Sequence, residues 1–229
     1  LTTAAACNES TGPGAPATLE LLEGADQTAT VGTVPENRIA VRVRDARGLP
    51  IRGETVTWTI GGGGGTIMNA DTRTDVLGVA EVTWRLGTAV GDNSLLPTVD
   101  GLPPISATAP ATAGAAANVN LSRDSVVLLL VGDTAHFGAS VTDAFGNPLD
   151  ATTVNWSSSD EGIATVSGQG VVTVTGRGTA TITARSSTAT STARVRVPLI
   201  GSVIVTPDSA AVASVGDTVA FTAAVTDEA

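Results

Sequence analysis

The sequence predicts an all-β protein built from more than one small β-sandwich, and three observations lead to this prediction. Thr, Val, Ala, Gly and Ser dominate the composition, and β-branched residues favour strands while Gly and Pro favour turns. Apolar and charged residues alternate over residues 38–44, which is the pattern of a half-buried antiparallel strand. A segment near the middle of the chain recurs at an offset of 84 residues, the size of a seven-stranded sandwich.

Composition and charge exclude several classes of function. The 229 residues carry a formal net charge of −10 and contain no Lys. An acidic chain repels phosphate backbones and anionic membrane surfaces, so we expect no nucleic-acid partner and no binding to a membrane through charge. The longest apolar run, 126–131, is far shorter than the roughly 20 residues that a spanning helix needs. Aromatic residues make up only 3%, which favours several thin cores over one large core.

The first 16 residues, LTTAAACNESTGPGAP, place small residues before the single cysteine of the chain, Cys7. This segment resembles the end of a bacterial lipoprotein signal, although Ala4 stands where such signals usually carry Leu. The resemblance implies that Cys7 is lipid-modified and that the residues up to 16 form a flexible tether. The alternative is an unpaired cysteine in a disordered tail. With one cysteine, no internal disulfide can form.

A first domain is predicted over residues 17–112. Its strand 38–44 directs Ile39, Val41 and Val43 to one face, and the segment DARGLP then predicts a turn. Asp can hydrogen-bond its own backbone, Gly permits a positive φ, and Pro ends the strand. The next strand directs Val56 and Trp58 inward, so that the tryptophan fills the space between two sheets.

Five glycines, 61–65, follow this strand. The run lacks the Gly-Lys-Ser/Thr ending that a phosphate-binding loop requires, so a nucleotide site is excluded. We expect instead an exposed, flexible loop inside the first domain. Because loop closure depends weakly on length, shortening this loop should barely change stability.

Two internal matches define the remaining domains. Residues 43–58 match residues 141–156 at 8 of 16 positions, which predicts a common scaffold for the first domain and a second domain over 118–197. Residues 119–143 match residues 203–227 at 12 of 25 positions, so 199–229 should hold the first two strands of a further, incomplete domain.

In that last segment a predicted inward stripe has nothing in this sequence to cover it; its residues are Val219, Phe221, Ala223 and Val225. Two explanations remain open. Either the sequence is part of a longer protein, or a neighbouring chain completes the sandwich by adding strands.

The motifs of the two larger domains resemble bacterial immunoglobulin-like domains of the intimin and invasin type. Residues 36–60 and the segment TDVLGVAEVTWRLG, 74–87, resemble the group 1 form. Residues 160–184, DEGIATVSGQGVVTVTGRGTATITA, resemble the group 2 form. The resemblance implies tandem immunoglobulin-like antiparallel β-sandwiches, outside the cell or on a bacterial surface, acting as a stalk that displays an adhesive tip.

Candidate sites for chemistry are weak. His136 is the single histidine, and the alternation around it points its side chain away from the core, so we expect neither a catalytic triad nor a zinc site. Asp143, Asn147 and Asp150 could supply oxygen ligands to calcium, but the equivalent segment of the first domain lacks the last two, which favours a turn. Arg194 and Arg196 are interpreted as charges on an edge strand that block pairing with other sheets.

We therefore predict a non-enzymatic structural or adhesion protein without metal or cofactor. Its partners would be other surface proteins or glycans, and it would contact the bacterial outer membrane only through a lipid on Cys7. The alternative is an accessory spacer or carbohydrate-binding region of a larger secreted polysaccharide-active enzyme. The predicted core aromatic residues are Trp58, Trp84, Trp156, Phe137 and Phe221. The predicted turn residues are Asp45, Gly48, Pro50, Asp75, Gly78, Asp143, Gly146 and Pro148.

Overall fold

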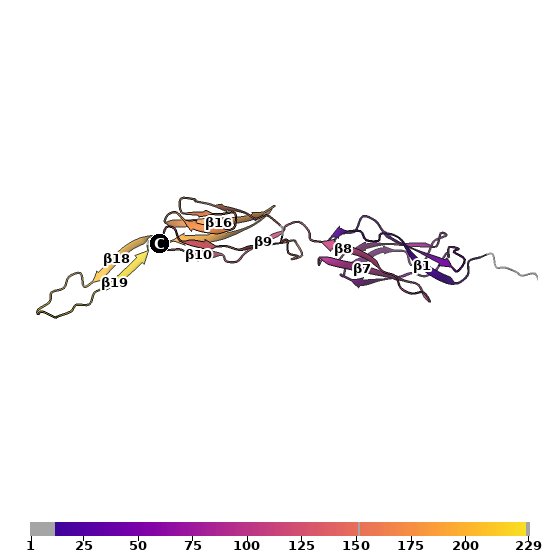
Figure 1. Ribbon diagram of the computed structural model, residues 1–229, viewed down its shortest axis with the longest axis horizontal. Coiled ribbons are helices and arrows are strands. Elements are labelled where there is room, and N and C mark those ends of the chain that lie inside the picture. The colour runs from indigo at the N-terminus through magenta and orange to yellow at the C-terminus, as the bar shows by residue number, and fades with distance from the viewer. Residues whose placement is uncertain (1–11, 151, 228–229) are drawn as a thin grey trace, which may run out of the picture. The chain divides into compact units, whose positions relative to one another are not determined.

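The computed structural model describes residues 12–150 and 152–227, and within these ranges the chain consists of strands and turns without an α-helix. No helix in this described part is therefore long and apolar enough to cross a membrane. The described residues form two compact units, of which the first consists mainly of residues up to Ala115 and the second mainly of residues from Ala116 (Figure 1). The predicted all-β class is confirmed.

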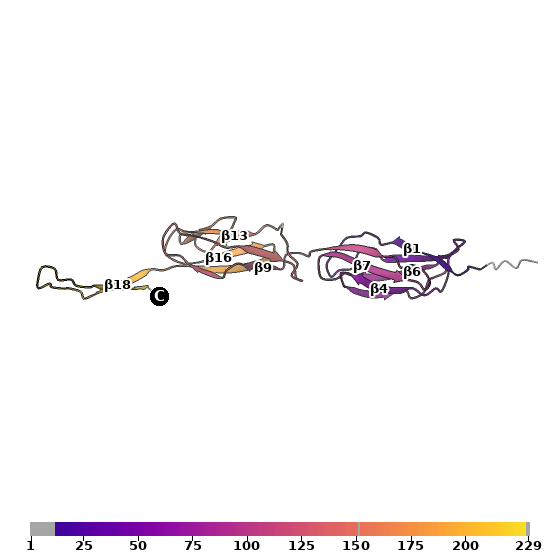
Figure 2. The ribbon, with the colours of Figure 1, turned by 60° about the horizontal axis from the view of Figure 1, so that its bottom comes forward.

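The first unit consists of two sheets. One has the order β1-β3-β6-β5 and the other the order β2-β8-β7-β4. Adjacent strands are antiparallel except β2 and β8, which run parallel; Figure 2 shows β4 beside β7. The strands are β1 (Pro16–Glu23), β2 (Ala29–Thr30), β3 (Ile39–Asp45), β4 (Thr57–Gly62), β5 (Thr66–Ala70), β6 (Val79–Arg85), β7 (Gly91–Thr98) and β8 (Ala107–Thr112).

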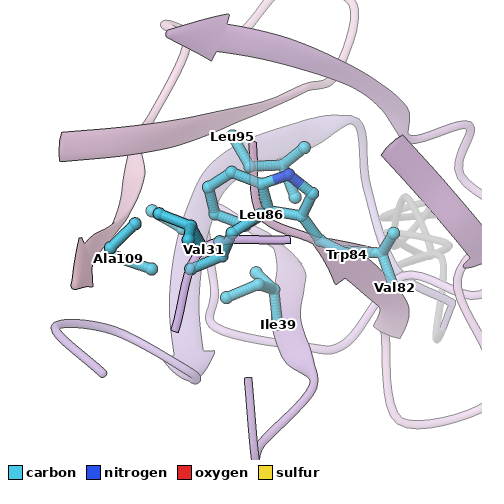
Figure 3. Packing of buried hydrophobic residues seen from close by; sticks show 9 residues of the cluster. Val31, Ile39, Val82, Trp84, Leu86, Leu95 and Ala109 are labelled. Carbon is cyan, nitrogen blue, oxygen red and sulfur yellow. The ribbon is translucent and has the colours of Figure 1, made fainter. Parts of the chain in front are cut away.

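The core of the first unit forms between the inner faces of these sheets. Along β3 the side chains of Ile39, Val41 and Val43 are buried, while Arg42 and Arg44 between them are partly exposed, as the alternation predicted. Trp84 on β6 is 2% exposed and packs among aliphatic residues from both sheets, including Leu95 on β7 (Figure 3). Burial of such a side chain contributes on the order of 3 kcal/mol.

The second unit repeats this strand order. One sheet has the order β10-β17-β16-β13, and the facing strands pair as β11-β15-β14 and β12-β9. If β11 and β12 are regarded as one interrupted strand, the order equals that of the first unit, including a parallel pair, β10 with β17. The strands are β9 (Asn118–Leu121), β10 (Ser125–Val127), β11 (Thr134–His136), β12 (Ala139–Thr142), β13 (Asn155–Ser158), β14 (Ala164–Val166), β15 (Val171–Val174), β16 (Gly178–Ser186) and β17 (Ala189–Val197).

The core of the second unit is centred on Phe137, which lies between β11 and β12 and is fully buried. It belongs to a cluster with Val172 of β15, Ile182 of β16 and Val195 of β17. Trp156 is half-buried on β13 and packs against this cluster. Alternate small residues on β16 and β17, such as Ala184, leave room for these larger side chains.

The interpretation of Arg194 and Arg196 as residues of an edge strand is wrong. Their strand, β17, lies between β16 and β10, and Arg194 and Arg196 are the register partners of Ser125 and Val127 on β10. The arginines are exposed because alternate positions of a strand face opposite sides of the sheet. The short parallel strand β10 could not be recognised from local periodicity.

The glycine run is more constrained than predicted. Gly61 and Gly62 belong to β4, and Gly63, Gly64 and Gly65 all have positive φ, between 71° and 102°. A Cβ atom on Gly65 would lie 2.2 Å from the carbonyl oxygen of Arg85. The prediction of a loose loop is therefore wrong, although the run is mostly exposed. It is a tight strand-to-strand turn that requires glycine.

Beyond the second sandwich, β18 (Ile200–Thr206) and β19 (Thr222–Asp227) form an antiparallel hairpin (Figure 1). Its sheet consists of these two strands within the described residues. Many of its apolar side chains are exposed, Val203, Phe221 and Val225 among them. The hairpin thus pairs its two strands as a sandwich does, but its apolar side chains are not buried.

Candidate functional site

The predicted turn at Asp45 is closed by its carboxylate. Oδ1 accepts hydrogen bonds from the backbone N–H groups of Arg47 and Leu49, both at 2.9 Å, and Oδ2 accepts one from the N–H of Gly14, also at 2.9 Å. The side chain is only 2% exposed and also contacts the Arg47 guanidinium at 3.2 Å. Gly48 has a φ of 80°, as the turn requires.

These donors change the acidity of Asp45. The Gly14 N–H, followed by the N–H groups of Leu49 and Arg47 and the Arg47 side chain, lowers the pKa of Asp45 from 3.8 to about 2, although burial acts in the opposite direction. These contacts tie the carboxylate to the backbone of its own turn and to the segment before β1. Gly14 is thereby held against the first sandwich, two residues before β1 begins.

A second turn of the same kind lies at Asp75. Its Oδ1 accepts from the N–H groups of Leu77 and Val79, both at 2.8 Å, and Gly78 has a φ of 74°. A Cβ atom on Gly78 would lie 2.6 Å from the carbonyl oxygen of Val43, so this turn also packs on β3. In both turns the acid and the glycine are three residues apart.

The corresponding turn of the second sandwich contains Asp143, which is buried, and Gly146, which has a φ of 88°. Thr142 forms an isolated antiparallel β-bridge with Pro148, and Arg44 forms the same bridge with Pro50 in the first sandwich. Asp150 is exposed whereas Asp143 faces inward. Among the residues that the structure describes, no group of three His, Cys, Asp or Glu is placed to hold a metal ion.

His136 is exposed on β11, as the alternation predicted, and its Nε2 lies 3.1 Å from the carbonyl oxygen of Gln169. No carboxylate hydrogen bond to this imidazole is recorded among the described residues. The structure therefore places the single histidine at the surface.

The predicted core aromatic residues differ in their burial. Trp84 and Phe137 are fully buried, while Trp58 and Trp156 are half-buried at equivalent positions on β4 and β13. The indole N–H of Trp58 donates to the carbonyl oxygen of Asp71 at 2.8 Å. Phe221 is 55% exposed, so the expectation of a core residue is not met within the described residues, where no strand covers it.

The remaining candidate is one side of the β18–β19 hairpin, which we call the hairpin face and define as Val203, Val205, Ala223 and Val225. Val203 lies opposite Val225 and Val205 lies opposite Ala223, so their side chains share one side of the sheet. The three valines are 56%, 46% and 61% exposed. These side chains therefore form a contiguous exposed apolar surface on one side of the hairpin.

Comparison with known families finds a match for the second sandwich. Residues 115–197 match the model of the bacterial Ig-like domain (group 2). This part of the chain is therefore similar to the group 2 bacterial Ig-like domain. The match covers the module whose motif DEGIATVSGQGVVTV suggested that form. The group 1 form of residues 17–112 stays a prediction, and comparison with curated proteins finds no match.

Comparison with solved structures finds similarity over most of the chain. The Escherichia coli adhesin FdeC is 18% identical, and the similarity covers 86% of this chain and 70% of that chain with a TM-score of 0.51. The Yersinia pseudotuberculosis adhesin InvE is 19% identical over 83% of this chain and 60% of that chain, with a TM-score of 0.42. A C-terminal fragment of intimin, solved with the intimin-binding domain of its translocated receptor, is 20% identical over 85% and 67%, with a TM-score of 0.35. The likeness to FdeC confirms the predicted tandem of immunoglobulin-like β-sandwiches.

Cys7, the predicted lipidation site, lies outside the described residues.

Proposed function

We propose that this chain is the non-enzymatic stalk region of a bacterial cell-surface protein, in which tandem Ig-like modules display an adhesive or structural part away from the envelope. One observation carries the proposal: the same module architecture occurs twice in succession, and its first strand pair occurs a third time. The strand order of the first unit recurs in the second unit, and the β9–β12 pair recurs as β18–β19.

The chemistry of the polar residues supports this role. The pKa of Asp45 is lowered to about 2, and its carboxylate closes a turn. The buried Thr74 hydroxyl likewise donates to the Ile51 carbonyl oxygen at 2.6 Å and accepts from the Glu54 N–H at 2.9 Å. Polar groups of this kind fix the ends of strands rather than bind a substrate.

The similar proteins support a surface location. FdeC and InvE are described as adhesins, and the intimin fragment was solved with a receptor domain. By analogy, the partners of this protein would be surface proteins or glycans. Attachment to the outer membrane would come from a lipid on Cys7.

A display experiment tests the proposed stalk. An epitope is placed after residue 229, and its labelling by an antibody is measured on intact cells. Deletion of residues 118–197 should strongly reduce labelling, because the epitope then lies closer to the envelope. A matched control replaces this module with a second copy of residues 17–112, which should restore labelling. Equal labelling of all three forms would contradict the stalk function.

The lipid anchor has its own test. Cys7→Ala should abolish incorporation of labelled palmitate and release the epitope-tagged protein into the medium, whereas a substitution of the neighbouring Asn8 to Ala should do neither. Absence of labelling in the parent protein would refute the anchor without affecting the stalk.

A further inference from the structure

We propose that the second sandwich binds the tip of a β-hairpin of a partner protein, in an open groove between β12 and the start of β13. The first sandwich fills the equivalent space with a hairpin tip of its own, and the contacts made there indicate what chemistry the groove recognises. This binding site is additional to the proposed stalk function and does not rest on it.

In the first sandwich, β5 and β6 are joined by residues 71–78, which we call the β5–β6 tip. Its backbone lies between β3 on one side and the segment that leads into β4 on the other. Three N–H donors from these two sides end on main-chain carbonyl oxygens of the tip. The pairs are the Val43 N–H with Gly78 at 2.8 Å, the Val56 N–H with Thr72 at 3.0 Å, and the indole N–H of Trp58 with Asp71 at 2.8 Å.

The second sandwich has a short turn in place of this tip. Residues 167–170 connect β14 to β15, and the turn is closed by its own hydrogen bonds. The Ser167 N–H donates to the Val171 carbonyl oxygen and the Gly170 N–H donates to that of Ser167, both at 2.9 Å. As a result, β15 begins opposite His136 on β11 and does not extend along β12, whose strand partner within the described residues is β9 alone.

The donors that the β5–β6 tip satisfies in the first sandwich have equivalents here. The internal match at an offset of 98 residues identifies them as the backbone N–H groups of Val141 and Val154 and the indole N–H of Trp156. None of the hydrogen bonds recorded in the described part of the chain uses any of the three. The Val141 N–H points away from β9, because the carbonyl oxygen of the same residue accepts from the Leu149 N–H at 2.9 Å. All three donors therefore lack the partner that the first sandwich supplies.

A groove lies where the tip is missing. Its volume is about 460 Å3, its two walls are residues 136–139 and residues 152–156 without Asn155, and residues 168–169 close one end. A second hollow of about 200 Å3 shares Ala139 and Val154 with it and continues along β12. The groove thus runs past the amides that have no acceptor, and it is long enough for several residues of a partner.

The chemistry of the occupant follows from the β5–β6 tip. The tip satisfies the three donors with main-chain carbonyl oxygens, which every hairpin tip carries. It places the small Thr74 inward, with 4% exposed, whereas Val76 and Leu77 are 64% and 60% exposed. The groove therefore recognises polypeptide backbone with a small inward side chain, which is recognition by strand addition rather than by a fixed sequence.

A graft tests the shape of the groove. In the full chain, residues 167–170 are replaced by residues 68–82, with ends chosen so that the flanking residues keep their cross-strand partners. Amide hydrogen exchange at Val141 and Val154 should slow by on the order of tenfold or more, because both N–H groups gain an acceptor. Protection of β16 shows that the module still folds. Unchanged exchange at both amides in such a folded graft would overturn the proposal.

A peptide tests binding of a hairpin from outside the chain. The probe is a fluorescently labelled peptide with the sequence of residues 68–82, closed into a ring through its ends to hold the hairpin conformation. Its anisotropy is measured as the unmodified full chain is added. We expect saturable binding, together with slower exchange at Val141 and Val154 in the bound chain.

Three substitutions locate the contact. Trp156→Phe keeps an aromatic ring but removes the indole N–H, and Val154→Pro removes a backbone N–H that the module itself does not use. Each should weaken peptide binding by about fivefold or more, because one carbonyl oxygen of the peptide then lacks its donor. The matched control is Trp58→Phe, which removes an indole N–H that is already bound within the first sandwich and should leave peptide binding unchanged.

The outcomes separate the alternatives. Absence of saturable binding, or binding that neither Trp156→Phe nor Val154→Pro weakens, would overturn the proposed site. Protection in the graft without binding of the peptide would show that the groove accepts a tip only from its own chain, which contradicts docking of a partner. All of these measurements use purified protein, so their failure and failure of the proposed stalk function are distinguishable.

Discussion

The two complete sandwiches have the same strand order but place their largest buried side chain on different strands. In the first, Trp84 lies on β6 and Ile39 occupies the position equivalent to Phe137. In the second, Phe137 lies between β11 and β12, and the strand equivalent to β6 is β15, with the smaller Val172. Each core therefore contains one fully buried aromatic residue. In the first module it comes from the second strand of the equivalent strand pair, β6, and in the second module from the first, between β11 and β12.

This difference shows that topology and packing are specified separately. The shared unit of residues 43–58 and 141–156 encodes a strand, a turn and a half-buried tryptophan in both modules. The position of the main aromatic residue varies around this unit. The fully buried aromatic residue is thus supplied by one or the other member of this strand pair rather than at one fixed position.

The largest effect is expected from truncating these two residues. Trp84→Ala and Phe137→Ala should each reduce the free energy of unfolding of their own module by about 3–5 kcal/mol, because each leaves a cavity that the sheets cannot close. Hydrogen exchange resolved by module measures both in the full chain. Each substitution should leave the exchange protection of the other module unchanged. Loss of protection in both modules would contradict the conclusion that each module has its own core.

The glycine run of the first module should produce the next largest effect. Gly65→Ala and Gly63→Ala place a Cβ within 2.2 and 2.4 Å of existing atoms, at φ of 102° and 71°. The strained φ alone costs about 1–2 kcal/mol, and the clash adds to it. Gly64→Ala is the control, since it has a similar φ but no atom within 4 Å of the added methyl group. Equal denaturation midpoints for all three variants would refute the role of close packing.

A double substitution tests whether the two cores are interchangeable. Trp84→Val should strongly destabilise the first module, and adding Ile39→Phe should restore about 1 kcal/mol or more, because the two side chains share one cluster. Urea unfolding of both single variants and the double variant gives the coupling energy. Strictly additive effects would show that a large side chain at position 39 cannot replace the one lost at position 84.

The smallest effect concerns the turn at Asp45 and depends on pH. Since the folded state lowers the pKa of Asp45 from 3.8 to about 2, the ionised carboxylate stabilises the fold fully above pH 3.8, and this contribution is lost as pH falls to about 2. Asp45→Asn should therefore melt at a lower temperature than the parent near neutral pH, and the difference should shrink between these two pH values. A difference independent of pH would show that the charge is unimportant.

The sequence predicted those features that depend on neighbouring residues. The alternation of β3, the turns at Asp45 and Asp75 and the outward position of His136 all follow from patterns a few residues long. The repeats also predicted the β18–β19 strand pair and the exposure of its apolar side chains in this sequence.

Features that depend on contacts distant in sequence were missed. The close packing of Gly65 and Gly63 reflects the approach of the Arg85 carbonyl oxygen and of the Asn93 side chain, respectively. The central position of β17 depends on its pairing with β10, more than sixty residues earlier. The Gly-Asp pair at 132–133 recurs at 216–217, and this repetition could have predicted the backbone contacts of Asp133 and Asp217.

The parallel pairing of an early strand with the last strand in each sandwich has a mechanical consequence. In the second module, the Arg194 N–H donates to the Asp124 carbonyl oxygen at 2.8 Å, and the Leu128 N–H donates to the Arg196 carbonyl oxygen at 3.0 Å. In the first, the Val31 N–H donates to the Thr112 carbonyl oxygen at 2.9 Å. A pulling force on the two ends of a module drives these strands past one another, so their hydrogen bonds bear the load together in shear instead of opening one at a time. The parallel strand pair of each sandwich therefore resists tension applied between the ends of its module.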